Sequence, residues 1–324
     1  MPAWQYKKGL HEIGSGSYAY LQPNGGWGLA NSGLIVDGDQ SLLVDTLVDA
    51  AHTRRMLDTI GDATGLRATD IRTVVNTHHD ADHTFGNFLM KHAEIIASKA
   101  AAETMAMRSP QEVATLKRNA PTMGSVGEYL LAIFSAYDWE DVELQLPTRT
   151  FEGELHIEVG GKRVHLIQVG PAHTVGDTLV HCPDQRIVYT GDILFIEGTP
   201  IIWAGPVSRW IAACERIMAL DVDIVVPGHG PITDKSGAAE VRDYLRFVDR
   251  EARKRYDAGL TVEEAVEDIG LGRYARWIDA ERVVVNVQKL YEEYGWKEHK
   301  TFMQLFDLMG LLWRRRQDGA RNGA

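Results

Sequence analysis

Residues 77–83 constrain this chain more than any other segment, because they bring three histidines and two aspartates together in seven residues. They read Thr-His-His-Asp-Ala-Asp-His and follow directly on the apolar segment 71–75, which is predicted to be a strand. A strand that runs into such a cluster delivers several ligands to one point at a sheet edge. Imidazoles and carboxylates in that arrangement are typical of a metal site. The segment therefore predicts a metalloenzyme.

Three later residues stand in similar surroundings. His173 lies in Gly-Pro-Ala-His-Thr-Val-Gly-Asp after the alternating segment 164–169, Asp192 lies in Tyr-Thr-Gly-Asp-Ile-Leu-Phe, and His229 lies in Val-Val-Pro-Gly-His-Gly. Each is the first polar, metal-competent residue beyond a short β-branched run and beside a glycine turn. We expect these residues and the first segment to meet at one metal centre.

Taken together, these places resemble the metallo-β-lactamase superfamily. Its pattern is His-x-His-x-Asp-His, followed by a histidine, a bridging aspartate and a last histidine at the ends of successive strands. The resemblance covers residues 14–234 and implies two metal sites. The first site would hold His78, the residue at position 80 and His173, and the second would hold Asp82, His83 and His229, with Asp192 bridging the two.

One position departs from that pattern. This chain has Asp80 where the family has its second histidine, and His79 falls on the spacer position. A carboxylate is a harder ligand than imidazole, so it favours iron or manganese more than an all-nitrogen zinc triad does. We expect Asp80 to be the ligand, with His79 as the alternative if the loop is rotated. Two divalent metal ions are therefore expected, with zinc favoured and iron or manganese as alternatives.

The resemblance also implies the fold, a mixed α/β (α+β) sandwich in which two β-sheets lie between helices in the order αββα. The sequence pattern agrees, because short strands at 18–21, 34–36 and 42–44 form an early meander, after which helices and strands alternate. We expect residues 1–236 to form this domain. Within it, residues 101–141 are a helical insertion near the site, either as a pocket wall or as a packing pair of helices.

Residues 237–324 are predicted to be a helical extension, because their apolar residues recur at helical spacing. Such faces need a partner, which is either the sandwich of the same chain or a second subunit in a homodimer. The apolar stripes are Tyr244, Phe247 and Val248; Val283, Val284, Val287, Leu290, Tyr291 and Tyr294; and Phe302, Leu305, Phe306, Met309, Leu312 and Trp313.

The ligand set indicates hydrolysis. Two bridged cations make hydroxide available near neutral pH, and Asp82 would bind the second metal and orient that nucleophile. The expected reaction is cleavage of an ester, thioester, lactone or amide in a small metabolite. Trp27, on a glycine-rich tip, and Trp203 are candidates for the substrate pocket, with ordinary packing as the alternative. Asp80 motivates a second interpretation, a non-haem iron oxidoreductase or oxygenase. A metal-stabilised binding module is a third.

Composition limits the partners. The net charge is −11, which disfavours a nucleic-acid surface, and a small-molecule substrate is expected instead. The opening residues do not read as a signal peptide, and no apolar run is long enough to span a bilayer, so a cytoplasmic protein without a membrane partner is predicted. Cys182 and Cys214 are too few for a disulfide framework and are predicted to be buried thiols.

Overall fold

The computed structural model describes the backbone of residues 4–322 and the side chains of residues 4–318. A seven-stranded sheet has its strands in sequence order, antiparallel from β1 to β4 and parallel from β4 to β7. These strands are β1 (Gly9–Gly14), β2 (Ser17–Leu21), β3 (Ser32–Asp37), β4 (Gln40–Val44), β5 (Thr73–Val75), β6 (Glu94–Ser98) and β7 (Arg149–Phe151).

A second sheet of five strands has the order β12-β11-β10-β9-β8. Its strands are antiparallel except for β11 and β12, which run parallel. They are β8 (Glu154–Val159), β9 (Lys162–Gln168), β10 (Thr178–Cys182), β11 (Ile187–Tyr189) and β12 (Ile224–Val226).

The two sheets face each other across a shared apolar core. Leu21, Ile35 and Val75 from the first sheet pack in the same cluster as Leu166 and Val180 from the second. Burying one face of each sheet removes apolar surface from water, which is the main force that stabilises such a sandwich.

Helices cover the outer faces of both sheets. On the first sheet, Met56 and Ile60 of α1 pack on Val74. On the second sheet, Trp210 of α6 and Leu245 of α7 pack in the cluster that contains Val188 and Val225. The arrangement is the αββα sandwich that the sequence predicts. The helices of the sandwich are α1 (Ala50–Thr64), α2 (Ala81–Thr84), α3 (Lys99–Met105), α4 (Pro110–Asn119), α5 (Gly124–Phe134) and α6 (Val207–Ala219).

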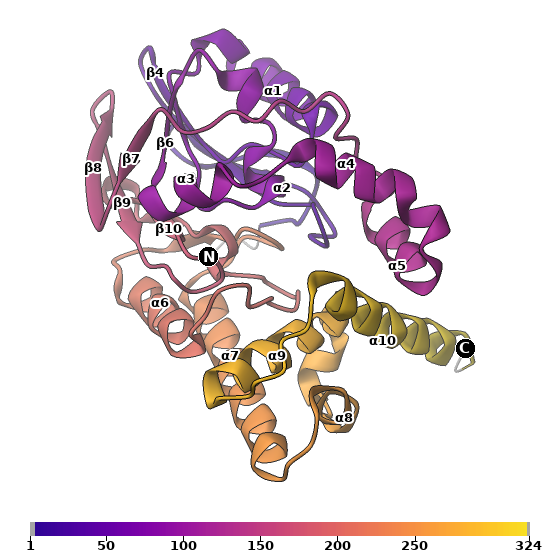
Figure 1. The fold of residues 1–324 in the computed structure, drawn as a ribbon. Coiled ribbons are helices and arrows are strands. Elements are labelled where there is room, and N and C mark those ends of the chain that lie inside the picture. Colours follow the sequence, from indigo (N-terminus) through magenta and orange to yellow (C-terminus); the bar gives the residue numbers. More distant parts are fainter. Residues whose placement is uncertain (1–3, 323–324) are drawn as a thin grey trace.

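The C-terminal helices pack on the rest of the same chain (Figure 1). Helix α7 lies along α6, α9 contacts α7 and α8, and α10 lies along α5. Most of the predicted apolar stripes are buried here, so they have a partner without a second subunit. The homodimer and the domain boundary at residue 236 stay predictions. These helices are α7 (Lys235–Asp257), α8 (Val262–Asp268), α9 (Val283–Tyr294) and α10 (Phe302–Asn322).

None of the helices that the structure describes is both long and apolar enough to cross a membrane. Both cysteines are buried and unbridged, as the sequence predicts.

Candidate metal centre

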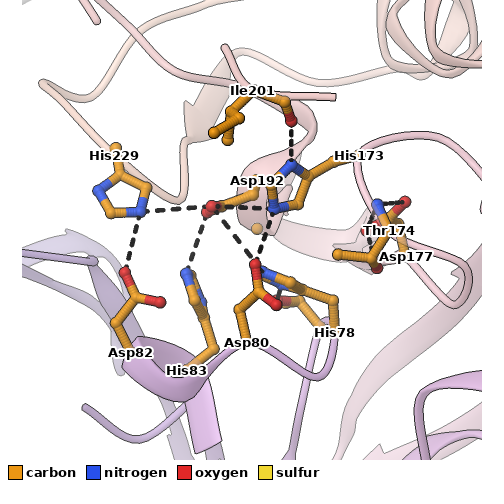
Figure 2. A network of polar contacts seen from close by, with 12 residues as sticks. His78, Asp80, Asp82, His83, His173, Thr174, Asp177, Asp192, Ile201 and His229 are labelled. Atoms are coloured by element: carbon orange, nitrogen blue, oxygen red, sulfur yellow. Dashed lines mark hydrogen bonds and ion pairs between the residues drawn. The ribbon is translucent and has the colours of Figure 1, made fainter. Parts of the chain in front are cut away.

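The loops that follow β5, β9, β11 and β12 bring all seven predicted ligands to one place (Figure 2). Three overlapping groups have ligand atoms that lie within 4.8 Å of one another. The groups are His78, Asp80 and His173; Asp82, His83 and His229; and His78, His83 and Asp192. The fold therefore brings these seven residues together, as the sequence analysis expects.

The first group lies around the carboxylate of Asp80. Its Oδ2 atom is 3.2 Å from Nε2 of His173 and 3.8 Å from Nε2 of His78. Two imidazole nitrogens and one carboxylate oxygen thus face a common point, as in a three-ligand catalytic metal site.

The second group lies across the site from the first. Nε2 of His229 is 3.4 Å from Oδ2 of Asp82, and Asp82 and His83 are both carried by the short helix α2. The donor set is again two imidazoles and one carboxylate.

Asp192 lies between the two groups. Its Oδ2 atom is 3.3 Å from Nε2 of His229 and 3.5 Å from Nε2 of His173, while its Oδ1 atom is 3.0 Å from Nε2 of His83. Gly228 leaves the necessary room, because a Cβ atom at that position would stand 2.0 Å from Oδ1 of Asp192. One carboxylate therefore contacts imidazoles of both groups, which is the geometry of a bridging ligand.

Each ligand histidine is oriented through its other ring nitrogen. Nδ1 of His83 lies 2.8 Å from a carboxylate oxygen of Asp45. Nδ1 of His173 lies 2.7 Å from the Ile201 carbonyl oxygen, and Nδ1 of His229 lies 3.0 Å from the Gly25 carbonyl oxygen. Nδ1 of His78 lies 3.0 Å from the Thr77 hydroxyl. Contacts of this kind fix the orientation of metal-binding imidazoles and point Nε2 at the metal.

Several polar atoms at the centre have no hydrogen-bond partner among the residues that the structure describes. They include Nε2 of His78, together with Nε2 of His83 and Oδ1 of Asp192, which are buried and lie 3.0 Å apart without the geometry of a hydrogen bond. Leaving such atoms unpaired costs free energy, so native proteins seldom do so without a reason. Divalent cations would satisfy these atoms, and the donor set suits them. The residues therefore fit a metal centre.

The charges of the centre support the same conclusion. Burial alone would lower the pKa of His229, but the carboxylates of Asp192 and Asp82 outweigh it and raise the pKa to about 9. Burial would raise the pKa of Asp192, yet the imidazoles of His229 and His83 hold it well below its usual value. The metal-free centre thus combines ionised carboxylates with protonated imidazole, and a bound cation would displace those protons.

His79 lies outside the three groups. Its Nε2 atom is 3.0 Å from a guanidinium nitrogen of Arg108, and burial lowers its pKa to about 4. The same guanidinium nitrogen is 3.4 Å from Oδ1 of Asp80, so Asp80 lies between Arg108 and His173. This arrangement favours Asp80 over His79 as the ligand, which stays a prediction.

The sequence interpretation missed two buried carboxylates that support the centre. Asp45 accepts hydrogen bonds from the backbone N–H and the hydroxyl of Thr77, both at 2.7 Å, and contacts His83. Asp177 accepts hydrogen bonds from the backbone N–H and the hydroxyl of Thr174, and these bonds fix the loop that carries His173. Two features of the sequence could have identified these carboxylates. Asp45 directly follows strand β4, and Asp177 lies in the same short segment as His173.

A cavity of about 280 Å³ opens beside the centre. Both predicted pocket residues, Trp27 and Trp203, line it, as do the predicted ligands Asp80 and Asp82. The insertion contributes much of the wall, and α10 closes one side. Their residues in the lining are Arg108, Val113, Leu116, Phe134 and Trp139 from the insertion and Phe302 and Phe306 from α10.

A family model described as the metallo-beta-lactamase superfamily matches residues 25–229, which is more than half of the chain. The chain belongs to this superfamily. The family match confirms the resemblance that the sequence carries and agrees with the metal-binding geometry. It does not address the aspartate at position 80.

Several curated proteins resemble this chain at low identity. The chain is 28% identical over 206 residues to 2,4-dinitroanisole O-demethylase subunit alpha of Nocardioides sp. (strain JS1661), covering 60% of this chain and 51% of that one. It is 23% identical over 264 residues to a linear primary-alkylsulfatase of Pseudomonas sp. (strain ATCC 19151), covering 71% of this chain and 48% of that one. It is 24% identical over 218 residues to an acyl-coenzyme A thioesterase of Bos taurus, covering 62% of this chain and 72% of that one. The chain spans about half the length of the first two relatives.

Solved structures share the fold of this chain. The inverting sec-alkylsulfatase Pisa1 from Pseudomonas sp. superposes with a TM-score of 0.66 at 16% identity, over 89% of this chain and 50% of that one. A metallo-beta-lactamase family protein from Thermus thermophilus superposes with a TM-score of 0.64 at 19% identity, over 86% of this chain and 94% of that one. At these identities the similarity concerns the fold alone.

Proposed function

We propose that this protein is a metal-dependent hydrolase that cleaves an ester or thioester bond in a small amphipathic molecule. The observation that carries the proposal is the position of the apolar cavity, which opens directly on the metal centre. Asp80 and Asp82 line it together with Trp27, Phe134 and Phe306. A substrate whose apolar part fills this cavity places its polar bond beside the ligand cluster.

The residues of the chain have separate tasks in this reaction. Divalent metal ions, when bound, supply Lewis acidity and activate water. Asp82 lies at the boundary between the ligand cluster and the cavity, and its side chain is 17% exposed. Its carboxylate can therefore accept a hydrogen bond from an attacking water and orient it towards the substrate. The aromatic walls exclude competing solvent and hold the apolar part of the substrate.

The relatives support this choice of bond. Two of them carry names that specify hydrolases, an alkylsulfatase and an acyl-coenzyme A thioesterase. An alkyl or acyl chain next to a polar ester-type group is common to both names, and the apolar cavity suits such a chain. Lactones and amides remain within the same reaction type but have less support from the relatives.

The proposal can be tested with a series of 4-nitrophenyl esters from acetate to octanoate, using protein loaded with zinc. Burying one CH2 group contributes about 0.8 kcal/mol, so kcat/KM should rise by about fourfold per methylene until the cavity is full. A flat series would contradict the assigned role of the cavity. Decanoyl-coenzyme A and decyl sulfate, measured in parallel, distinguish thioester from sulfate ester cleavage.

The metal-dependent step can be tested with Asp192→Ala. Removing the bridging carboxylate should reduce turnover by at least about 100-fold, since even partners outside the ligand shell contribute about 10 to 100-fold. Asp39→Ala is the matched control, because Asp39 is exposed in the turn between β3 and β4. Unchanged turnover in Asp192→Ala would rule out the bridging role.

A second candidate function is oxidation or oxygenation at a non-haem iron centre. The presence of Asp80, Asp82 and Asp192 in one cluster favours it, because carboxylates suit harder cations such as iron(II) and manganese(II). Protein purified without added metal should then contain iron and absorb visible light. Zinc in that protein would favour hydrolysis.

A further inference from the structure

The charge of the cavity is unevenly distributed. Among its lining residues, Asp80 and Asp82 carry negative charge at the metal centre, and most of the others are apolar or aromatic. Arg108 is the one lining residue with a positive charge in the part of the chain that the structure describes. It belongs to the loop between α3 and α4, at the start of the insertion. The cavity therefore has a single cation next to the ligand cluster.

Arg108 is held in place through one end of its guanidinium group. A single nitrogen, Nη2, lies 3.0 Å from Nε2 of His79 and 3.4 Å from Oδ1 of Asp80. His79 is mostly buried, and Asp80 is held from its other oxygen by His173. These contacts fix where the guanidinium lies without using most of its hydrogen-bond donors.

The remaining donors are available to a ligand. Within the described residues, Nε and Nη1 of Arg108 make no hydrogen bond, and the side chain is 50% exposed although it lines the cavity. A guanidinium presents its N–H groups as a planar fork that matches two oxygens of a carboxylate, sulfate or phosphate. Covering these free N–H groups with a purely apolar ligand would leave them without hydrogen-bond partners and cost free energy, so a ligand with an oxygen acceptor at this position is favoured.

We infer that Arg108 forms an anion subsite beside the metal centre, and that the substrate carries a negatively charged oxygen group attached to its apolar part. The inference rests on the proposed hydrolase function, because the bound anion is a substrate only if the protein cleaves it. In a chain with a net charge of −11, Arg108 places a local positive charge in the cavity wall, beside the carboxylates of Asp80 and Asp82.

The subsite can be tested by calorimetric binding of octanoate and 1-octanol to the zinc-loaded protein, which requires no turnover. Arg108→Gln should weaken octanoate binding by about tenfold and leave 1-octanol unchanged, the size expected when a charge-assisted hydrogen bond at a half-exposed site is lost. Arg108→Lys should recover part of the loss. Octyl sulfate and octyl phosphate, tested on the same variants, identify the preferred anionic group.

The control variant is Arg118→Gln. Arg118 lies on α4, is similarly exposed and pairs with Glu140, but does not line the cavity. It should bind all four probes as the original protein does. If Arg108→Gln weakens octanoate and 1-octanol equally, or loses zinc, then Arg108 acts by positioning Asp80 and the anion subsite is wrong. A failure of ester cleavage with the octanoate preference intact would instead contradict only the hydrolase function.

Discussion

Replacing Arg282 should destabilise the protein and disturb the metal centre together. Arg282 is 2% exposed, and its guanidinium lies 2.8 Å from Oδ2 of Asp279 and 3.1 Å from the Thr199 carbonyl. It also lies 4.2 Å from the ring centroid of Trp27 and 5.4 Å from that of Phe195. The buried guanidinium of Arg282 therefore contacts three separate segments. They are the segment before α9 with Asp279, the glycine-rich loop with Trp27, and the loop after Asp192 with Phe195.

The size of the effect follows from these contacts. In Arg282→Met the apolar part of the side chain is kept, but Asp279 loses its buried partner. Removing one member of a buried pair costs about 3 to 5 kcal/mol. Asp279 retains 17% exposure of its side chain, so water compensates in part and the lower figure of about 3 kcal/mol applies. For a chain of 324 residues, with an unfolding entropy of about 2.1 cal/mol/K per residue, we expect the Tm to fall by about 4 °C.

The same variant should weaken metal binding. Phe195 stacks on the imidazole of His229, with 5.0 Å between ring centroids and 2° between planes, and the variant removes the cation–π contact of Arg282 with Phe195. Thermal unfolding by circular dichroism and zinc titration measure the two effects. Arg276→Met is the control, because Arg276 is exposed on a neighbouring turn. A Tm within about 1 °C of the original protein, combined with normal zinc affinity, would refute the reasoning.

Three further predictions concern the ligand loop, the C-terminal helices and protonation. Asp80→His should shift the bound metal towards zinc, and His79→Ala should leave metal content nearly unchanged; the reverse result in elemental analysis would make His79 the ligand. Deleting residues 280–324 should expose apolar faces and cause aggregation, whereas a monodisperse, active truncation in size-exclusion chromatography would show these helices to be dispensable. Zinc binding at pH 7 should release about one proton or more, because the pKa of His229 is raised to about 9 and that imidazole is protonated in the metal-free protein. The release should diminish above pH 9, and calorimetry in two buffers of different ionisation enthalpy measures it.

The convergence of the seven predicted ligands could be inferred from sequence because their signals are local. His173, Asp192 and His229 each follow a β-branched run and lie next to a glycine, and the fold brings strand ends together. One short strand gives no such signal. Strand β7 (Arg149–Phe151) has two exposed residues out of three and pairs with β6, about fifty residues earlier, so it has no clear alternating pattern.

The partners of the ligands could not be predicted, because they depend on contacts between distant segments. Asp45 meets His83 across 38 positions, and Arg108 meets Asp80 across 28. The apolar stripe of α10 was visible in the sequence, but a stripe does not specify which surface covers it. The structure shows that Phe306 of α10 packs near Trp27 and closes the cavity, with ring centroids 5.9 Å apart.

Elemental analysis by inductively coupled plasma mass spectrometry tests the central claim most directly, when combined with ester hydrolysis by the same samples. The metal centre predicts about two divalent ions per chain after loading and dialysis, loss of hydrolysis on chelation, and recovery on adding metal back. Asp192→Ala should retain fewer ions than the Asp39→Ala control. Less than one ion per chain after loading, or hydrolysis that chelation leaves unchanged, would contradict the account.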